Sequence, residues 1–168
     1  FNGKSVSFEV GEYDASETLI IDPGLIWATY FGGTNLDVVN DLVQDASGNV
    51  FVTGYAISLN FPVSAGAFQT VNAGSQDAYV AKLDANGQRM WATYIGGTSS
   101  DNGMSIALDA YGNAVISGQT SSNNFPVSPG AFQTAYQGGI DAFVAQFNGI
   151  GQRIWASYLG GTRDDISQ

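Results

Sequence analysis

Short apolar runs alternate with polar turns along most of the chain, and this pattern predicts β-strands. Segments 39–45 and 103–109 alternate apolar and polar residues, most clearly at Met104, Ile106 and Leu108, as a half-buried strand does. No window combines helical periodicity with capping residues. The expected strands are 39–45, 50–56, 77–84 and 89–97, and then 103–109, 114–120, 141–148 and 153–161. The chain is therefore predicted to be all-β.

Turn signals separate these strands. The sequence Asp-x-x-Gly-Asn stands at 45–49 and again at 109–113, where the carboxylate can cap the turn and glycine can supply a positive φ. Longer excursions follow the second strand of each set. Pro62, Pro126 and Pro129 exclude these excursions from a central strand, because proline cannot donate to a ladder.

The strand pattern repeats at a fixed step of 64 residues. "WATYFGGT" at 27–34 returns as "WATYIGGT" at 91–98 and "WASYLGGT" at 155–162. "NFPVSAGAFQT" at 60–70 likewise returns as "NFPVSPGAFQT" at 124–134. Four consecutive antiparallel strands per repeat are typical of a propeller blade. The coils of a β-solenoid are shorter than this unit, so four-stranded antiparallel blades are favoured.

The repeat predicts about two complete blades plus partial blades at both ends. Residues 1–24 are expected to form a lead-in hairpin of an incomplete first blade, joined by a strand at 25–31. The first repeat with its leading strand is placed at 25–90, the second at 91–154, and the start of a further blade at 155–168. Closed propellers use about four to eight blades. Two blades therefore predict either further repeats of a longer chain or self-association, ring-like or head to tail.

Composition removes several function classes. The net charge is −10, and the five basic residues form no run, so nucleic-acid binding is not expected. The absence of Cys and His removes thiol nucleophiles, imidazole bases and the usual zinc ligands. No apolar stretch is long enough for membrane insertion.

The repeated aromatic residues have two interpretations. Trp27, Trp91 and Trp155 could line a glycan-binding surface, or they could fill the space between successive blades. Phe61 and Phe125, with Phe68 and Phe132, could present an apolar patch, or they could pin the excursions to the sheets. The sequence leaves ligand binding open in both cases and favours packing.

The repeated acidic residues are likewise open to two interpretations. Asp37, Asp45, Asp101 and Asp109 could help to bind calcium, which prefers several oxygen ligands, or they could cap turns. No cofactor other than calcium is suggested. Catalysis is not expected, since nearly every acid has a copy 64 residues away and no imidazole accompanies the hydroxyl groups. The chain is therefore predicted not to be an enzyme.

The ordered motifs "DPGLIWATYFGGT", "DASGNVFVTGYA", "NFPVSAGAFQT" and "DAYVAKLDANGQRMWATYIGGT" resemble the SBBP repeat of bacterial β-propeller proteins. The segment before them looks like the end of a domain that often precedes such repeats. The resemblance implies a scaffold of blades and an extracellular or cell-surface location, and it offers no catalytic motif. The expected function is an extracellular structural scaffold or adhesion module that can assemble into a filament. A carbohydrate-binding module is the alternative.

Overall fold

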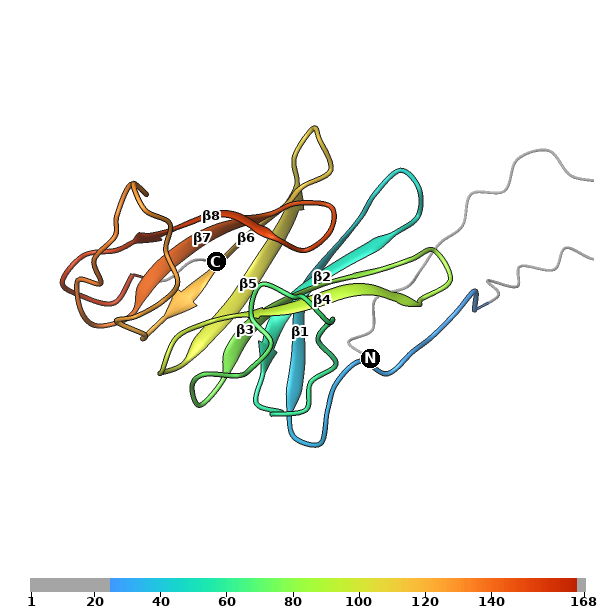
Figure 1. Cartoon of the computed structure of the whole chain (residues 1–168), viewed down its shortest axis with the longest axis horizontal. Helices are drawn as coiled ribbons and strands as arrows, with labels where there is room; N and C mark the ends of the chain where they lie inside the picture. Colours follow the sequence, from blue (N-terminus) through green and yellow to red (C-terminus); the bar gives the residue numbers. More distant parts are fainter. Residues whose placement is uncertain (1–24, 166–168) are drawn as a thin grey trace, which may run out of the picture.

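The computed structural model describes residues 25–165, which form two four-stranded antiparallel sheets (Figure 1). The first sheet, or first blade, contains β1 (Asp37–Gln44), β2 (Val50–Ala56), β3 (Asp77–Leu83) and β4 (Arg89–Ile95). The second contains β5 (Asp101–Leu108), β6 (Ala114–Thr120), β7 (Asp141–Phe147) and β8 (Arg153–Leu159). The all-β prediction and the four-stranded blades are confirmed. None of the described segments is a helix that could cross a membrane.

The two blades have the same strand order and the same irregularities. The first strand of each blade is bulged, between Val39 and Asp41 in β1 and between Gly103 and Ser105 in β5. The Asp-x-x-Gly-Asn turns place Gly48 and Gly112 at φ 81° and 78°, the left-handed region that glycine tolerates best. The sequence signal for these turns is confirmed.

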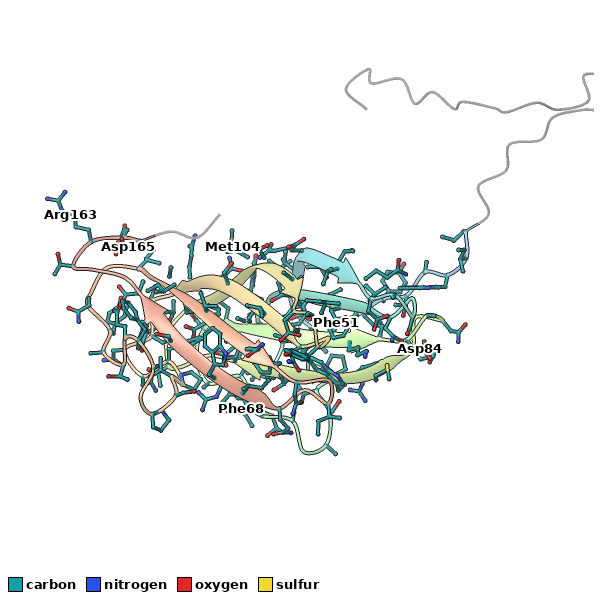
Figure 2. All side chains as sticks on the ribbon, turned by 90° about the horizontal axis from the view of Figure 1, so that it is seen from above. Phe51, Phe68, Asp84, Met104, Arg163 and Asp165 are labelled. Atoms are coloured by element: carbon teal, nitrogen blue, oxygen red, sulfur yellow. The ribbon has the colours of Figure 1, made fainter. Side chains whose placement is uncertain are left out.

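The blades pack face to face (Figures 1 and 2). We call the face of a blade that points to the following blade its forward face, and the opposite one its backward face. The forward face of the first blade carries Phe51, Val80, Trp91 and Ile95, which share one core with Ile116, Phe143 and Phe147 on the backward face of the second blade. A second core covers the backward face of the first blade, where Tyr79 and Tyr94 pack with Phe31 and Phe61.

Two predicted boundaries were wrong. Residues 25–31 were expected to form a leading strand, but no strand begins before Asp37 in the described part of the chain. A strand needs a neighbour to pair with, and within residues 25–165 this segment packs on a blade face without a ladder partner. Residues 155–168 were expected to start a further blade, yet Arg153–Leu159 is the fourth strand of the second sheet. The hairpin predicted for 1–24 lies outside the described residues.

Blade and repeat are therefore out of phase. The repeat boundaries at 90/91 and 154/155 fall inside β4 and β8. Residues 96–100 carry the chain from the outermost strand of the first blade to the first strand of the second. Each Trp motif thus closes one blade and leads directly into the junction with the next.

Candidate functional site

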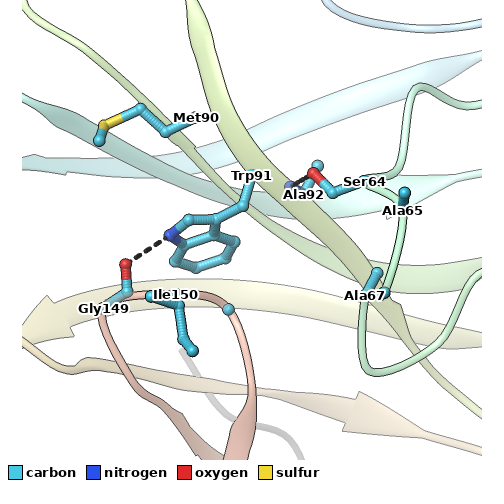
Figure 3. Close-up of a pocket in the computed structure, with 10 residues that line it drawn as sticks. Ser64, Ala65, Ala67, Met90, Trp91, Ala92, Gly149 and Ile150 are labelled. Carbon is cyan, nitrogen blue, oxygen red and sulfur yellow. Dashed lines mark hydrogen bonds between the residues drawn. The ribbon is translucent and has the colours of Figure 1, made fainter.

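The junction between the blades is built around Trp91 from β4. Its indole is only 6% exposed, and its Nε1 donates to the carbonyl of Gly149 at 2.9 Å (Figure 3). A Cβ added to Gly151 would lie 2.7 Å from Cε3 of the indole, so only glycine allows the turn to approach this closely. Ser64, Met90 and Ile150 line a cavity of about 300 Å³ beside it. With the indole so enclosed, Trp91 joins two blades.

The equivalent tryptophans lie in different environments. Trp27 is half-buried and contacts the turn of the first blade, where a Cβ on Gly87 would be 2.6 Å from its Cε3. Trp155 is 38% exposed and donates through Nε1 to Oε1 of Gln146 in its own sheet. The contact between the indole and a glycine turn is therefore complete at Trp91, partly buried at Trp27 and not made at Trp155 within the described residues.

The repeated phenylalanines of the excursions divide into two groups. Phe61 and Phe125 are both buried at 3% exposure, with ring centroids 4.5 Å from Tyr79 and 4.4 Å from Phe143. Packing thus explains this pair, in agreement with the interpretation that these side chains pin the excursions to the sheets. Phe68 and Phe132 are less enclosed: Phe68 is half-buried with its ring centroid 6.3 Å from that of Phe147, whereas Phe132 is 88% exposed. It is the large aromatic side chain that the second excursion leaves in solvent.

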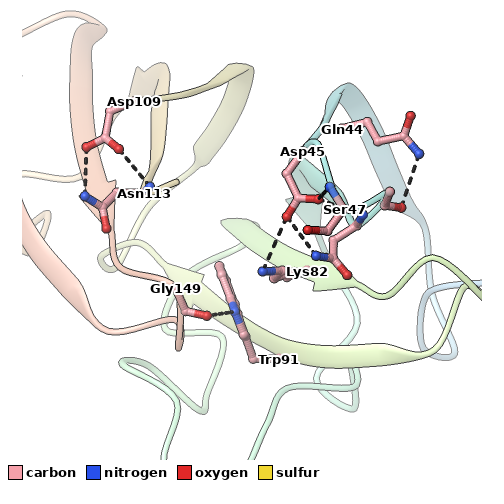
Figure 4. Close-up of polar contacts among 10 residues, drawn as sticks. Gln44, Asp45, Ser47, Lys82, Trp91, Asp109, Asn113 and Gly149 are labelled. Atoms are coloured by element: carbon pink, nitrogen blue, oxygen red, sulfur yellow. Dashed lines mark hydrogen bonds and ion pairs between the residues drawn. The ribbon is translucent and has the colours of Figure 1, made fainter. Parts of the chain in front are cut away.

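Asp45 and Asp109 cap their own turns. Oδ1 of Asp109 accepts hydrogen bonds from the backbone of Tyr111 and Asn113, and Oδ2 accepts one from Nδ2 of Asn113 (Figure 4). One repeat earlier, Asp45 accepts the equivalent hydrogen bonds from Ser47 and Asn49 and forms an ion pair with Lys82 at 3.7 Å. The asparagine side chain is the main cause that lowers the pKa of each carboxyl group. Both acids are thus held as turn acceptors.

Asp37 and Asp101 fix the Gly-Gly turns. Asp101 is fully buried and accepts hydrogen bonds from Gly97 N, Thr120 Oγ1 and Ser122 Oγ. Asp37 accepts from Gly33 N at 2.6 Å and from Ser58 Oγ at 2.7 Å. Residues 25–165 contain no group of three or more His, Cys, Asp or Glu side chains placed to hold a metal ion. The four calcium candidates are thus not brought together.

Sequence reasoning missed Asp77, a buried acid at the same junction. Its Oδ2 accepts from Gln69 Nε2 and Ala73 N, whereas its Oδ1 is buried with no hydrogen-bond partner. A Cβ on Gly96 would lie 2.8 Å from both Oδ1 of Asp77 and Oδ2 of Asp101. Burial raises the pKa of Asp77 to about 6, and the nearby Asp101 carboxylate adds to the effect. The recurrence of aspartate at position 141 was the available signal.

A family model described as the β-propeller repeat, SBBP, matches residues 26–62 and 91–126. This chain is an SBBP-repeat protein. Each match begins at the Trp motif and ends after the first two strands of a blade, and the second match crosses the junction from β4 to β5. The SBBP unit therefore contains the contact between blades as well as part of a blade. No curated protein matches the chain.

The SBBP assignment and the fold together describe a repeat-based β structural module. Its repeated polar residues hold turns and connections, and its repeated aromatic residues fill the spaces within and between blades. Within residues 25–165, one end face remains accessible, whereas residues 25–34 cover the backward face of the first blade. The forward face of the second blade carries the half-buried side chains Val115, Ala142 and Val144 beside the exposed Trp155 and Leu159.

Proposed function

We propose that the chain is a non-enzymatic extracellular scaffold module whose blades join other blades through their end faces. The supporting observation is the pair Trp91 and Trp155, which share a sequence motif but are 6% and 38% exposed. Where a second blade is present, the indole is buried; where the described chain supplies none, it stays open. The open face thus has the same construction as a face already used for blade packing.

The acidic residues support a structural role. Asp37, Asp45, Asp101 and Asp109 each accept two or more hydrogen bonds from nearby turns and connections. A catalytic pair of carboxylates needs a shared accessible space, and these acids hold backbone instead. The proposed extracellular location rests on the SBBP resemblance alone.

The test is the size of the purified 168-residue chain over a wide concentration range, measured by sedimentation velocity and light scattering. Association by end faces predicts a mass that rises with concentration, with elongated or ring-shaped particles in electron micrographs. A monodisperse monomer throughout this range would contradict the proposed assembly. A location test uses surface labelling of the native producing cell.

Carbohydrate binding is the second candidate, because one aromatic site is open. Trp155 and Phe132 line a shallow cavity of about 310 Å³ together with Ser128 and Gly130, and exposed aromatic faces suit sugar rings. The expected result is glycan binding that Trp155→Ala abolishes and that the folded Tyr111→Ala control retains. Binding unaffected by Trp155→Ala would remove this candidate.

A further inference from the structure

Residues 25–34 occupy on the first blade the place that residues 89–98 occupy on the second. Trp27 packs on Gly87 as Trp91 packs on Gly151. Thr34 donates its backbone N–H to Asn60 Oδ1 at 3.0 Å. Thr98 does the same to Asn124 at 2.9 Å. The backward face of the first blade is therefore covered by an imitation of the outermost strand of a preceding blade.

Residues 25–34 lack the strand pairing that holds β4 in place. Residues Arg89–Ile95 are strand β4 and pair with β3 along their length, whereas residues 25–31 are in no ladder within the described chain. Leu25, Ile26 and Tyr30 are all more than 80% exposed. The segment is thus held mainly by Trp27, Phe31 and the Gly-Gly-Thr turn, which makes it the replaceable part of this face.

A third copy of the motif has the opposite deficiency. Residues 153–159 are strand β8 and pair with β7, but Trp155 contacts no glycine turn of a following blade in the described chain. "RIWASYLGGT" at 153–162 closely matches "LIWATYFGGT" at 25–34. Residues 25–34 therefore pack on a blade without pairing with a strand. Residues 153–159 pair with a strand but pack on no following blade in the described chain.

We propose that residues 153–162 of one copy displace residues 25–34 from the first blade of a second copy, so that Trp155 packs against Gly87. This inference rests on the proposed association of blades and names the contact that makes it. The incoming motif is already ordered in β8, so its docking costs little further conformational entropy. It also brings Val144 and Leu159 onto an apolar face, as Val80 and Ile95 already are in the existing junction.

One position sets a limit on this contact. In the existing junction, a Cβ on Gly103 would collide with Oγ1 of Thr53, so glycine lets β5 approach β2. The equivalent residue on the first blade is Val39, which is 48% exposed, and it would face Ser117 of the incoming blade. In the proposed contact, the isopropyl group of Val39 therefore limits how closely β1 approaches the incoming blade. Val39→Gly is therefore expected to strengthen association several-fold.

The decisive experiment compares two equivalent tryptophans in the full chain by sedimentation equilibrium. Trp155→Ala removes the incoming side chain and should weaken self-association at least tenfold. Trp27→Ala loosens the segment to be displaced and should strengthen self-association several-fold. Tyr111→Ala, an exposed aromatic side chain on a turn, should leave it unchanged. If both tryptophans only contributed nonspecific hydrophobic contacts, both substitutions would weaken self-association. That result would overturn the inference.

Cross-linking tests the geometry. Asp41 Oδ2 accepts a hydrogen bond from Ser105 Oγ at 2.8 Å across the existing junction, and the 64-residue step predicts Ser105 of one copy beside Asp41 of the next. The chain has no cysteine, so Asp41→Cys and Ser105→Cys variants have no background. A short thiol cross-linker should join the two variants when mixed, and neither variant to itself.

The outcomes separate the two proposals. Monomers in the wild type and in Trp27→Ala would overturn both the proposed assembly and the exchange. Self-association that persists in Trp155→Ala would overturn only the proposed displacement of residues 25–34, and so would cross-linking of a cysteine variant to itself. Either result would leave a scaffold whose copies join through another surface.

Discussion

Trp91 and Trp155 stand in closely similar sequence motifs but have different surroundings in the structure. Trp91 lies between two blades with its N–H bonded to Gly149 of the next blade, whereas Trp155 bonds within its own sheet to Gln146. The difference shows that the motif does not stabilise the blade that carries it so much as the join to the following one. Removing equivalent side chains should therefore have unequal effects.

The largest effect is expected from Trp91→Ala. Truncating a buried aromatic side chain costs about 3–5 kcal/mol of unfolding free energy, and here it also leaves the carbonyl of Gly149 without its donor. Trp155→Ala in the monomeric range should cost less than about 1 kcal/mol, as exposed substitutions do. Urea denaturation of both variants measures the contrast. Equal losses would refute the distinction between a closed and an open junction.

The glycine turn under Trp91 gives the next largest difference. Gly151 and Gly112 have φ of 80° and 78°, so alanine imposes the same backbone strain at both. A Cβ on Gly112 meets nothing within 4 Å, whereas on Gly151 it meets the indole. Gly151→Ala should be more destabilising than Gly112→Ala by about 1–2 kcal/mol, the range for overpacking a tight site. Thermal melts compare them, and similar losses would exclude a close-fitting junction.

Asp77 should make the junction sensitive to pH. Burial raises the pKa of Asp77 in the folded state to about 6, above the ordinary value of an aspartate, so folding favours the protonated form. The stability that protonated Asp77 contributes to the folded state is fully present below about pH 4 and is lost as the pH rises through 6. Asp77→Asn keeps an acceptor for Ala73 and carries no charge, so it should raise stability at pH 7 by about 2 kcal/mol. The gain should vanish near pH 4, and unchanged stability at pH 7 would show that burial does not disfavour the charge.

The smallest effect belongs to the polar contact between the first strands of the blades. Ser105→Ala removes the hydroxyl group that donates to Asp41, while the Ile106 N–H still binds the same oxygen. The expected loss is about 0.5–1 kcal/mol, typical of one hydrogen bond. Ser47→Ala, an exposed turn residue whose backbone alone binds Asp45, is the control. A loss of more than about 3 kcal/mol in unfolding free energy would contradict this order, because the hydrogen bond would then stabilise the junction as much as the packing of the Trp91 indole.

Much of each blade could be predicted from local pattern. The expected strand at 114–120 has the observed bounds, and the Asp-x-x-Gly-Asn turns have glycine at positive φ. These features depend on residues close together in the chain. Four strands per unit and repetition then sufficed for a blade.

The errors arose where structure depends on a distant partner. Residues 25–31 carry the same strand signal as 89–95, yet only the second segment lies beside β3. The importance of Asp77 follows from Gly96 and Asp101, which lie in the connection between blades and at the start of the next sheet. The Gly151 turn that receives Trp91 lies in the next repeat, so neither residue alone reveals the contact.

The offset between blade and repeat has a consequence for how such chains lengthen. Unequal recombination that gains or loses one 64-residue step at any point leaves every β4-to-β5 passage intact, because the passage lies inside the step. The protein's gene can therefore vary its number of units without creating a new kind of boundary between blades.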